Sequence, residues 1–236
     1  MSANFLKVKS KPTRLTYLLL FGLIAGCASN PFPEHWWHSD SNAPAAGWEI
    51  LPEAAQNGEV ILSKRNELGI LSNFSATPFE YRKRKYASVE GFWQSMKFPE
   101  GPNDLRLKNN KIIWSHTREE VENMTGFDAK KAGDEASENM KLLKISWVTF
   151  EGRRFPYRSS SKGEHYRLIR EAMEAKLEQN PKVRETLLST RDLKLLPDHH
   201  QSAEDPPEWR YYEIWMEIRE ALKVKIFKNR SRRSCS

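Results

Sequence analysis

The sequence predicts a single α+β domain that is mainly helical, with a small antiparallel sheet or hairpin. Apolar residues recur at helical spacing over residues 168–177 and 207–224, and Asn180-Pro181 is a typical helix start. Residues 59–63 and 79–86 have instead the short β-branched or aromatic composition of strands. The chain has 236 residues, 39% of them hydrophobic, which is enough for one domain with extensions and a sizeable core.

The basic charge of the chain lies at its two ends. Of the formal net charge of +7, residues 1–26 carry +4 and residues 223–236 carry +6, which leaves −3 on residues 27–222. Because the predicted domain is mildly acidic, we expect no broad nucleic-acid-binding face. The two cysteines, Cys27 and Cys235, are too few for a disulfide framework or a four-ligand zinc site. We assign no metal site and expect no cofactor.

Residues 1–26 have the features of a bacterial lipoprotein signal peptide. A basic stretch without acids precedes an apolar run over residues 15–25, which is shorter than the roughly 20 residues of a spanning helix. Ile24-Ala25-Gly26-Cys27 resembles a lipobox, in which the cysteine becomes the lipid-modified first residue. The predicted location is therefore the cell envelope, at the outer membrane. An ordinary cleaved signal, or an apolar N-terminal helix of a cytoplasmic protein, is the alternative.

Residues 27–57 are predicted to be a tether. Prolines, among them Pro31, Pro33 and Pro44, and a Ser/Asn/Ala-rich run leave little that could pack. His35-Trp36-Trp37-His38 interrupts this composition, but its two histidines have no further histidine or cysteine close by in the sequence to complete a metal site. The favoured interpretation is an aromatic patch that docks on the domain or on lipid headgroups.

The predicted domain spans residues 58–222. Its first strand is Glu59–Ser63, and Phe79–Tyr81 and Lys85-Tyr86 flank the basic tip of a hairpin. Amphipathic helices follow, the last of them from about Pro207 to Val224, and their apolar stripes are assigned to the core. Residues 223–236 are predicted to be a mobile basic tail.

Residues 88–98 predict a helix that carries the candidate functional residues. Ser88 is a favourable N-cap, and the helix has one apolar face: Val89, Phe92 and Met96. Its second face is chemically mixed: Glu90, Trp93, Gln94 and Lys97. Because tryptophan is rarely left in water, we expect this face to be covered. Glu90 lies in the first turn, where the helix dipole favours an ionised carboxylate that stabilises a cation. Spacing alone also allows a structural glutamate beside a partly buried tryptophan.

Several blocks follow one another in a characteristic order across about Gly69 to Leu222. They are Leu71-Ser-Asn-Phe-Ser-Ala-Thr-Pro-Phe79, Tyr86-Ala-Ser-Val-Glu-Gly-Phe-Trp-Gln-Ser-Met-Lys-Phe98, Ala129-Lys-Lys-Ala-Gly133, Ala175-Lys-Leu-Glu-Gln-Asn180, Leu187-Leu-Ser-Thr190 and Trp215-Met-Glu-Ile-Arg-Glu-Ala-Leu222. In this order they resemble the NADAR family, also called YbiA-like. The resemblance implies a mainly helical α+β fold and an N-glycosidase that cuts a bond between a nitrogen and ribose C1. Family substrates include phosphorylated riboflavin precursors and ADP-ribosyl adducts.

The resemblance also implies roles for single residues. The catalytic glutamate of the family falls on Glu90, and the glutamine and lysine that follow it fall on Gln94 and Lys97. The implied pocket wall is Ser72, Asn73 and Phe74, and Gly133 falls where two backbones approach closely. Trp93 either stacks on a base or fills the core, and Lys97 either neutralises a phosphate or is solvated. The implied ligand is a small nucleotide or an ADP-ribosyl compound.

Two positions depart from the family pattern. Many members have Glu-His where this chain has Glu90-Gly91. Many also carry a Trp-Gly…Gly-x-Asn segment before the final helix, where this chain has residues 205–212. Either Trp209 replaces a base-stacking surface there, or the loop is closed or reshaped. The resemblance thus implies a membrane-anchored N-glycosidase, held by lipid on Cys27. The departures favour the alternative, a non-catalytic nucleotide-binding or interaction module on the same fold.

Overall fold

The computed structural model describes residues 31–39 and 44–233. The predicted signal peptide and the lipidation site at Cys27 lie outside these residues and stay predictions. From Phe32 onward the chain clusters as one unit.

Short strands pair in three separate two-stranded sheets. The strands are β1 (Glu59–Ile61), β2 (Phe79–Tyr81), β3 (Arg84–Tyr86), β4 (Trp147–Phe150), β5 (Arg153–Pro156) and β6 (Lys194–Leu196). The predicted hairpin is β2–β3, and its turn residues Arg82 and Lys83 have φ angles of 49° and 65°, as two-residue hairpin turns require. The sequence did not predict the antiparallel β4–β5 pair or the parallel β1–β6 pair.

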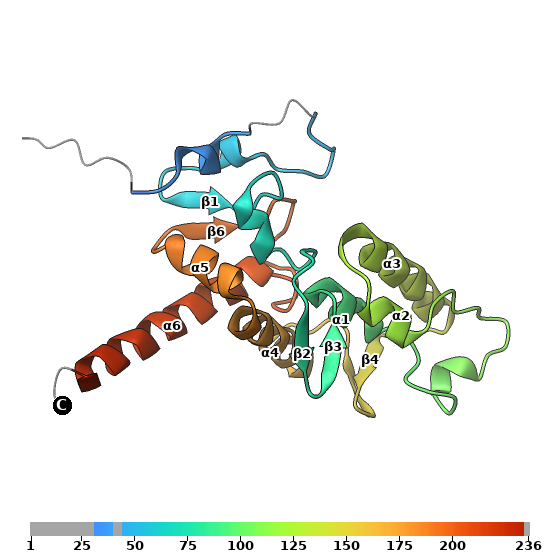
Figure 1. The fold of residues 1–236 in the computed structure, drawn as a ribbon. Coiled ribbons are helices and arrows are strands. Elements are labelled where there is room, and N and C mark those ends of the chain that lie inside the picture. Colours follow the sequence, from blue (N-terminus) through green and yellow to red (C-terminus); the bar gives the residue numbers. More distant parts are fainter. Residues whose placement is uncertain (1–30, 40–43, 234–236) are drawn as a thin grey trace, which may run out of the picture. The chain divides into compact units, whose positions relative to one another are not determined.

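Helices make up most of the remaining ordered structure. They are α1 (Val89–Ser95), α2 (Arg118–Glu122), α3 (Gly126–Leu142), α4 (Glu164–Gln179), α5 (Pro181–Ser189) and α6 (Tyr211–Arg233). In Figure 1, α1 lies between α4 on one side and α2 and α3 on the other, and it contacts all three. Every residue of α1 is buried. The prediction of a mainly helical α+β domain with small sheets is confirmed.

The predicted tether is wrong for the part of it that the structure describes. Two 3₁₀ helices, Glu34–Trp37 and Pro52–Ala54, pack against β1. Trp36 is 2% exposed, belongs to the main core and donates from Nε1 to Glu67 at 2.6 Å. The aromatic patch therefore docks on the domain, because Glu67 and the core supply partners that composition alone does not reveal.

The predicted basic tail is a continuation of the last helix. We expected the helix to end near Val224, but α6 runs to Arg233. Its apolar face is buried as far as Leu222, and Val224 is exposed. The core contact therefore ends where predicted, while the backbone stays helical beyond it.

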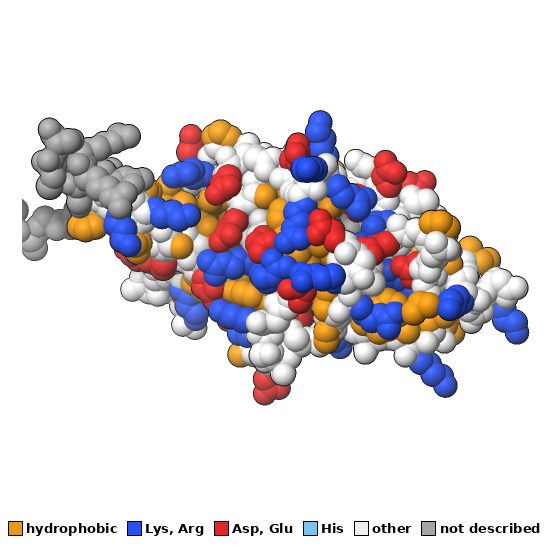
Figure 2. All heavy atoms as spheres, turned by 90° about the horizontal axis from the view of Figure 1, so that it is seen from below, with side chains coloured by type: hydrophobic (Ala, Val, Ile, Leu, Met, Phe, Trp, Pro, Cys, Tyr) orange, Lys and Arg blue, Asp and Glu red, His pale blue; other side chains and the backbone are white. Residues whose placement is uncertain are grey.

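None of the helices in the described part of the chain is both long and apolar enough to span a membrane. Figure 2 shows one face of the molecule, on which Lys and Arg side chains are interspersed with Asp and Glu.

Candidate active site

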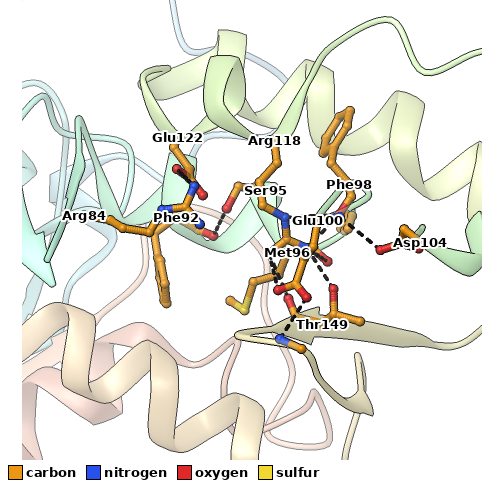
Figure 3. Close-up of polar contacts among 12 residues, drawn as sticks. Arg84, Phe92, Ser95, Met96, Phe98, Glu100, Asp104, Arg118, Glu122 and Thr149 are labelled. Atoms are coloured by element: carbon orange, nitrogen blue, oxygen red, sulfur yellow. Dashed lines mark hydrogen bonds and ion pairs between the residues drawn. The ribbon is translucent and has the colours of Figure 1, made fainter. Parts of the chain in front are cut away.

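Helix α1 is held at both ends. At its start, Ser88 Oγ accepts a hydrogen bond from the backbone N–H of Gly91 at 2.9 Å and donates one to the Met124 carbonyl, so the predicted N-cap is confirmed. Beyond its last turn, the buried Arg118 guanidinium donates to the carbonyls of Phe98 at 2.6 Å and Thr149 at 3.0 Å (Figure 3). These bonds fix the helix relative to α2 and β4.

A cavity of about 790 Å³ opens beside α1. The site residues predicted from the sequence that line it are Ser72, Asn73, Phe74, Glu90, Trp93, Gln94, Lys97 and Trp209. Gly133 lies behind this wall, where it contacts Gln94 and accepts a hydrogen bond from Lys97. The fold thus brings the predicted catalytic and substrate-binding residues to one place.

Glu90 is the central carboxylate of this wall. Its Oε1 accepts a hydrogen bond from Gln94 Nε2 at 2.6 Å, and its backbone N–H donates to the Asn73 carbonyl at 2.9 Å. Only 5% of Glu90 is exposed. The second bond ties the loop of residues 72–75 to the first turn of α1.

Burial opposes the effect that the helix dipole was predicted to have on Glu90. Burial raises the pKa of Glu90 above its ordinary value, although the hydrogen bond from Gln94 and the charge of Lys97 both act to lower it. Desolvation disfavours the charged carboxylate more than one first-turn dipole interaction can favour it. Glu90 is therefore a carboxyl group that keeps its proton to higher pH than an exposed glutamate does.

Lys97 is buried and not a solvated surface lysine. Its Nζ donates to the Gly133 carbonyl at 2.9 Å and to Ser137 Oγ at 2.8 Å, and it lies 4.7 Å from the centre of the Tyr157 ring. Burial lowers the pKa of Lys97 to about 8, against the opposing charge of Glu90. The cavity therefore pairs a carboxyl group that resists ionisation with an ammonium that releases its proton easily.

A second buried lysine supports the loop that forms the pocket wall. Lys176 Nζ donates to the Ser72 carbonyl at 2.8 Å and to Ser75 Oγ at 2.6 Å. Burial lowers the pKa of Lys176 to about 7. The sequence analysis assigned this lysine no role, although it lies in one of the blocks that resemble the family.

Two glycines mark close backbone approaches around α1. A Cβ at Gly133 would lie 1.8 Å from Gln94 Oε1, so only glycine leaves room for the amide that bonds Glu90. A Cβ at Gly91 would lie 2.6 Å from the Met124 carbonyl oxygen and 2.8 Å from that of Val121. Position 91 therefore faces α2 and the chain after it, away from the cavity. A histidine there would require a different spacing between α1 and α2.

We expect Gly133→Ala to lower the free energy of unfolding by about 1–3 kcal/mol through overpacking. A decrease in the free energy of unfolding would indicate the close approach, because Ala in place of Gly inside a helix ordinarily stabilises by about 0.5–1 kcal/mol. The displaced Gln94 amide would also stop lowering the pKa of Glu90, so that pKa should rise further. Denaturant unfolding and a carboxyl NMR titration measure the two effects. Gly101→Ala, where a Cβ meets nothing within 4 Å, is the control; a stabilised Gly133→Ala protein would contradict the close approach.

The rebuilt segment before α6 is anchored and contributes to the cavity. Glu208 is fully buried, accepts hydrogen bonds from the backbone N–H and Oγ of Ser159, and lies 3.5 Å from His165 Nδ1. Trp209 consequently lies at the cavity, 6.0 Å from the Tyr157 ring, with the Arg158 guanidinium 4.6 Å from its ring centre. The segment thus brings a tryptophan to the cavity wall.

The cavity also includes residues that the sequence analysis missed. They are Trp48, Lys64, Phe127, Lys130, Asp134, Ser137, Glu138, Lys141, Tyr157, Arg158, His199, Gln201 and Tyr211. Asp134 and Glu138 are further carboxylates, but each pairs with a lysine at 2.6 Å, Asp134 with Lys130 and Glu138 with Lys141. A tryptophan in the proline- and alanine-rich stretch before β1 was the one sequence signal that could have drawn attention to position 48. Among residues 31–39 and 44–233, no three His, Cys, Asp or Glu side chains gather as metal ligands.

The chain matches no protein-family model and none of the curated proteins. Among solved structures it is similar to the NMR structure of the E. coli protein YbiA, with 20% sequence identity and a TM-score of 0.43. The match covers 74% of this chain and 90% of that one. A similarity of this extent assigns no activity, so the functional argument rests on the cavity itself.

Proposed function

We propose that the protein is an N-glycosidase that hydrolyses a ribose C1–N bond in a nucleotide, ADP-ribosyl or riboflavin-precursor-like compound. The observation that carries the proposal is the buried Glu90 carboxyl group, which lines a cavity and is oriented by Gln94. Breaking a C1–N bond develops positive charge on the ribose, and a fixed carboxylate stabilises that charge. The raised pKa of Glu90 also suits it to take a proton from the attacking water.

The other wall residues supply binding and charge balance. Lys97, two residues after the end of α1, places a buried ammonium at the same cavity wall as Glu90, suited to an anionic group of the ligand. Asn73 Oδ1 and Trp209 Nε1 are buried without a hydrogen-bond partner among the described residues. An unmet acceptor and an unmet donor in cavity-lining residues favour a polar ligand.

The proposal is tested by release of free base from N-ribosyl substrates, with wild type compared to Glu90→Gln. The panel should include ADP-ribosyl-guanine, an NAD-like compound and a riboflavin precursor, because these represent the substrate classes implied by the resemblance. If wild type releases no base from any of them, the non-catalytic binding module becomes the better account.

The pH dependence of base release should identify both titrating groups. We expect kcat/KM to rise with pH as Glu90 ionises, above the ordinary carboxyl range because burial raises its pKa. It should fall around pH 8, where Lys97 loses its proton and its charge. Lys97→Met should remove the falling limb and move the rising limb to higher pH, because the Lys97 charge lowers the pKa of Glu90. A falling limb that survives in Lys97→Met would exclude Lys97 as its source.

We further propose that lipid on Cys27 anchors the mature protein to the cell envelope, on the strength of the basic, apolar and lipobox-like sequence of residues 1–27. Acyl chains contribute about 0.8 kcal/mol per buried CH₂, so a multiply acylated cysteine holds a protein stably. Cys27→Ser should release the protein from membranes without changing its unfolding curve. Mass spectrometry of the mature N-terminus provides the direct check, and an intact Met1 would refute the anchor.

A further inference from the structure

Three aromatic side chains border the cavity, and two of them, Trp48 and Phe127, have been assigned no role so far. Trp48 is 40% exposed and Phe127 is 58% exposed, and both line the cavity together with Phe74. The ring centroids of Trp48 and Phe127 are 5.7 Å apart, and those of Phe74 and Phe127 are 5.2 Å apart. A contiguous group of exposed aromatic rings at a cavity is typical of a binding surface.

The cluster is built from three distant segments and is held in place. Trp48 precedes β1, Phe74 lies in the loop after the 3₁₀ helix Glu67–Leu71, and Phe127 lies in the first turn of α3. The backbone N–H of Gly126 donates to the Phe74 carbonyl at 3.0 Å. Glu49, next to Trp48, pairs with Arg65 at 2.7 Å. The rings are therefore presented by fixed backbone.

A cation accompanies these rings. Lys64 Nζ lies 5.2 Å from the centre of the Trp48 ring and 5.1 Å from that of Phe74, and it pairs with the buried carboxylate of Asp198. Aromatic faces beside an ammonium suit a planar ring that carries an anionic group. Nucleobases with a phosphate have this chemistry.

We propose that Trp48, Phe74 and Phe127 form a ring-stacking subsite for a nucleobase of a phosphorylated ligand, distinct from the base that leaves at Glu90. The distinction between a stacked base and a leaving base rests on the proposed function, whereas the stacking of a base on these rings does not. The cavity volume of about 790 Å³ lies in the upper part of the range of about 300–1,000 Å³ of small-molecule sites. It therefore has room for a ligand with a ring at each end.

Calorimetric titration with AMP and with ribose 5-phosphate tests the subsite, because the two probes share the phosphate and differ in the ring. Trp48→Ala and Phe127→Ala should each weaken AMP binding roughly 5- to 100-fold, the range that stacking on one aromatic side chain supports. Trp48→Phe should retain most of the affinity. Ribose 5-phosphate should bind equally to wild type and to both alanine variants.

Phe227→Ala is the matched control, because Phe227 is 72% exposed and does not line the cavity; it should leave AMP binding unchanged. No binding of AMP by wild type, or equal binding by wild type, Trp48→Ala and Phe127→Ala, would overturn the subsite. A loss confined to Trp209→Ala would place the ring at the Glu90 end and also overturn it. If Trp48→Ala and Phe127→Ala both bind AMP more weakly but wild type releases no base from any substrate, the stacking subsite is supported and the glycosidase proposal is refuted.

Discussion

Glu90→Gln should lower base release roughly 10²- to 10³-fold, because removing one group that stabilises transition-state charge costs about 2.7–4 kcal/mol. Glutamine keeps the shape and the hydrogen-bonding reach of the side chain but cannot become an anion or accept a proton from water. Ground-state binding of a nucleotide should persist, so the loss should appear in kcat. Glu135→Gln is the control, because Glu135 lies on α3 outside the cavity lining. Equal rates for wild type and Glu90→Gln would remove Glu90 as the catalyst.

Glu90→Gln should lower activity but raise the free energy of unfolding at higher pH. A carboxyl group whose pKa is raised by folding binds more protons in the folded state, so wild-type stability should fall as pH rises from the ordinary carboxyl range through the folded pKa. Glu90→Gln removes this dependence and should be the more stable protein above that window. Thermal unfolding at several pH values measures it. If the variant is less active yet more stable, the loss of activity comes from the missing catalytic carboxylate, since misfolding would lower both activity and stability.

The elements that could be predicted from the sequence are those determined by neighbours along the chain. The Ser88 cap and the β2–β3 hairpin depend on contacts within a few residues, and the α4 and α6 stripes depend on helical period. The β1–β6 pair joins Val60 to Leu195 through strands of three residues each. So short a strand has no local signal that identifies a distant parallel partner.

The site was predictable in its residues but not in its electrostatics. Helix α1 was found from its cap and its mixed face, and the fold brings that face to the cavity. The raised pKa of Glu90 depends on its burial, which only the folded chain produces. Trp48 and Phe127 were missed for a related reason. Their residue types are ordinary, and only the folded chain places them beside Phe74.

Trp36→Ala should lower the free energy of unfolding by about 3–5 kcal/mol, the cost typical of removing a buried tryptophan. Trp36 lies in a segment whose composition predicted a tether, yet it is 2% exposed and packs in the main core. The substitution leaves a cavity and also removes the donor to Glu67, a carboxylate that shares its hydrogen bonds between Trp36 and His35. Denaturant unfolding of the wild type and the variant measures the difference.

Trp48→Ala is the matched control for Trp36→Ala, because it removes the same side chain from the same stretch of sequence at an exposed position. Trp48→Ala should change stability little and weaken AMP binding, whereas Trp36→Ala should lower stability much more. The contrast separates a residue that belongs to the core from one that belongs to the cavity. Unchanged unfolding of Trp36→Ala would mean that residues 32–39 contribute nothing to the fold and act as the tether that their composition indicates.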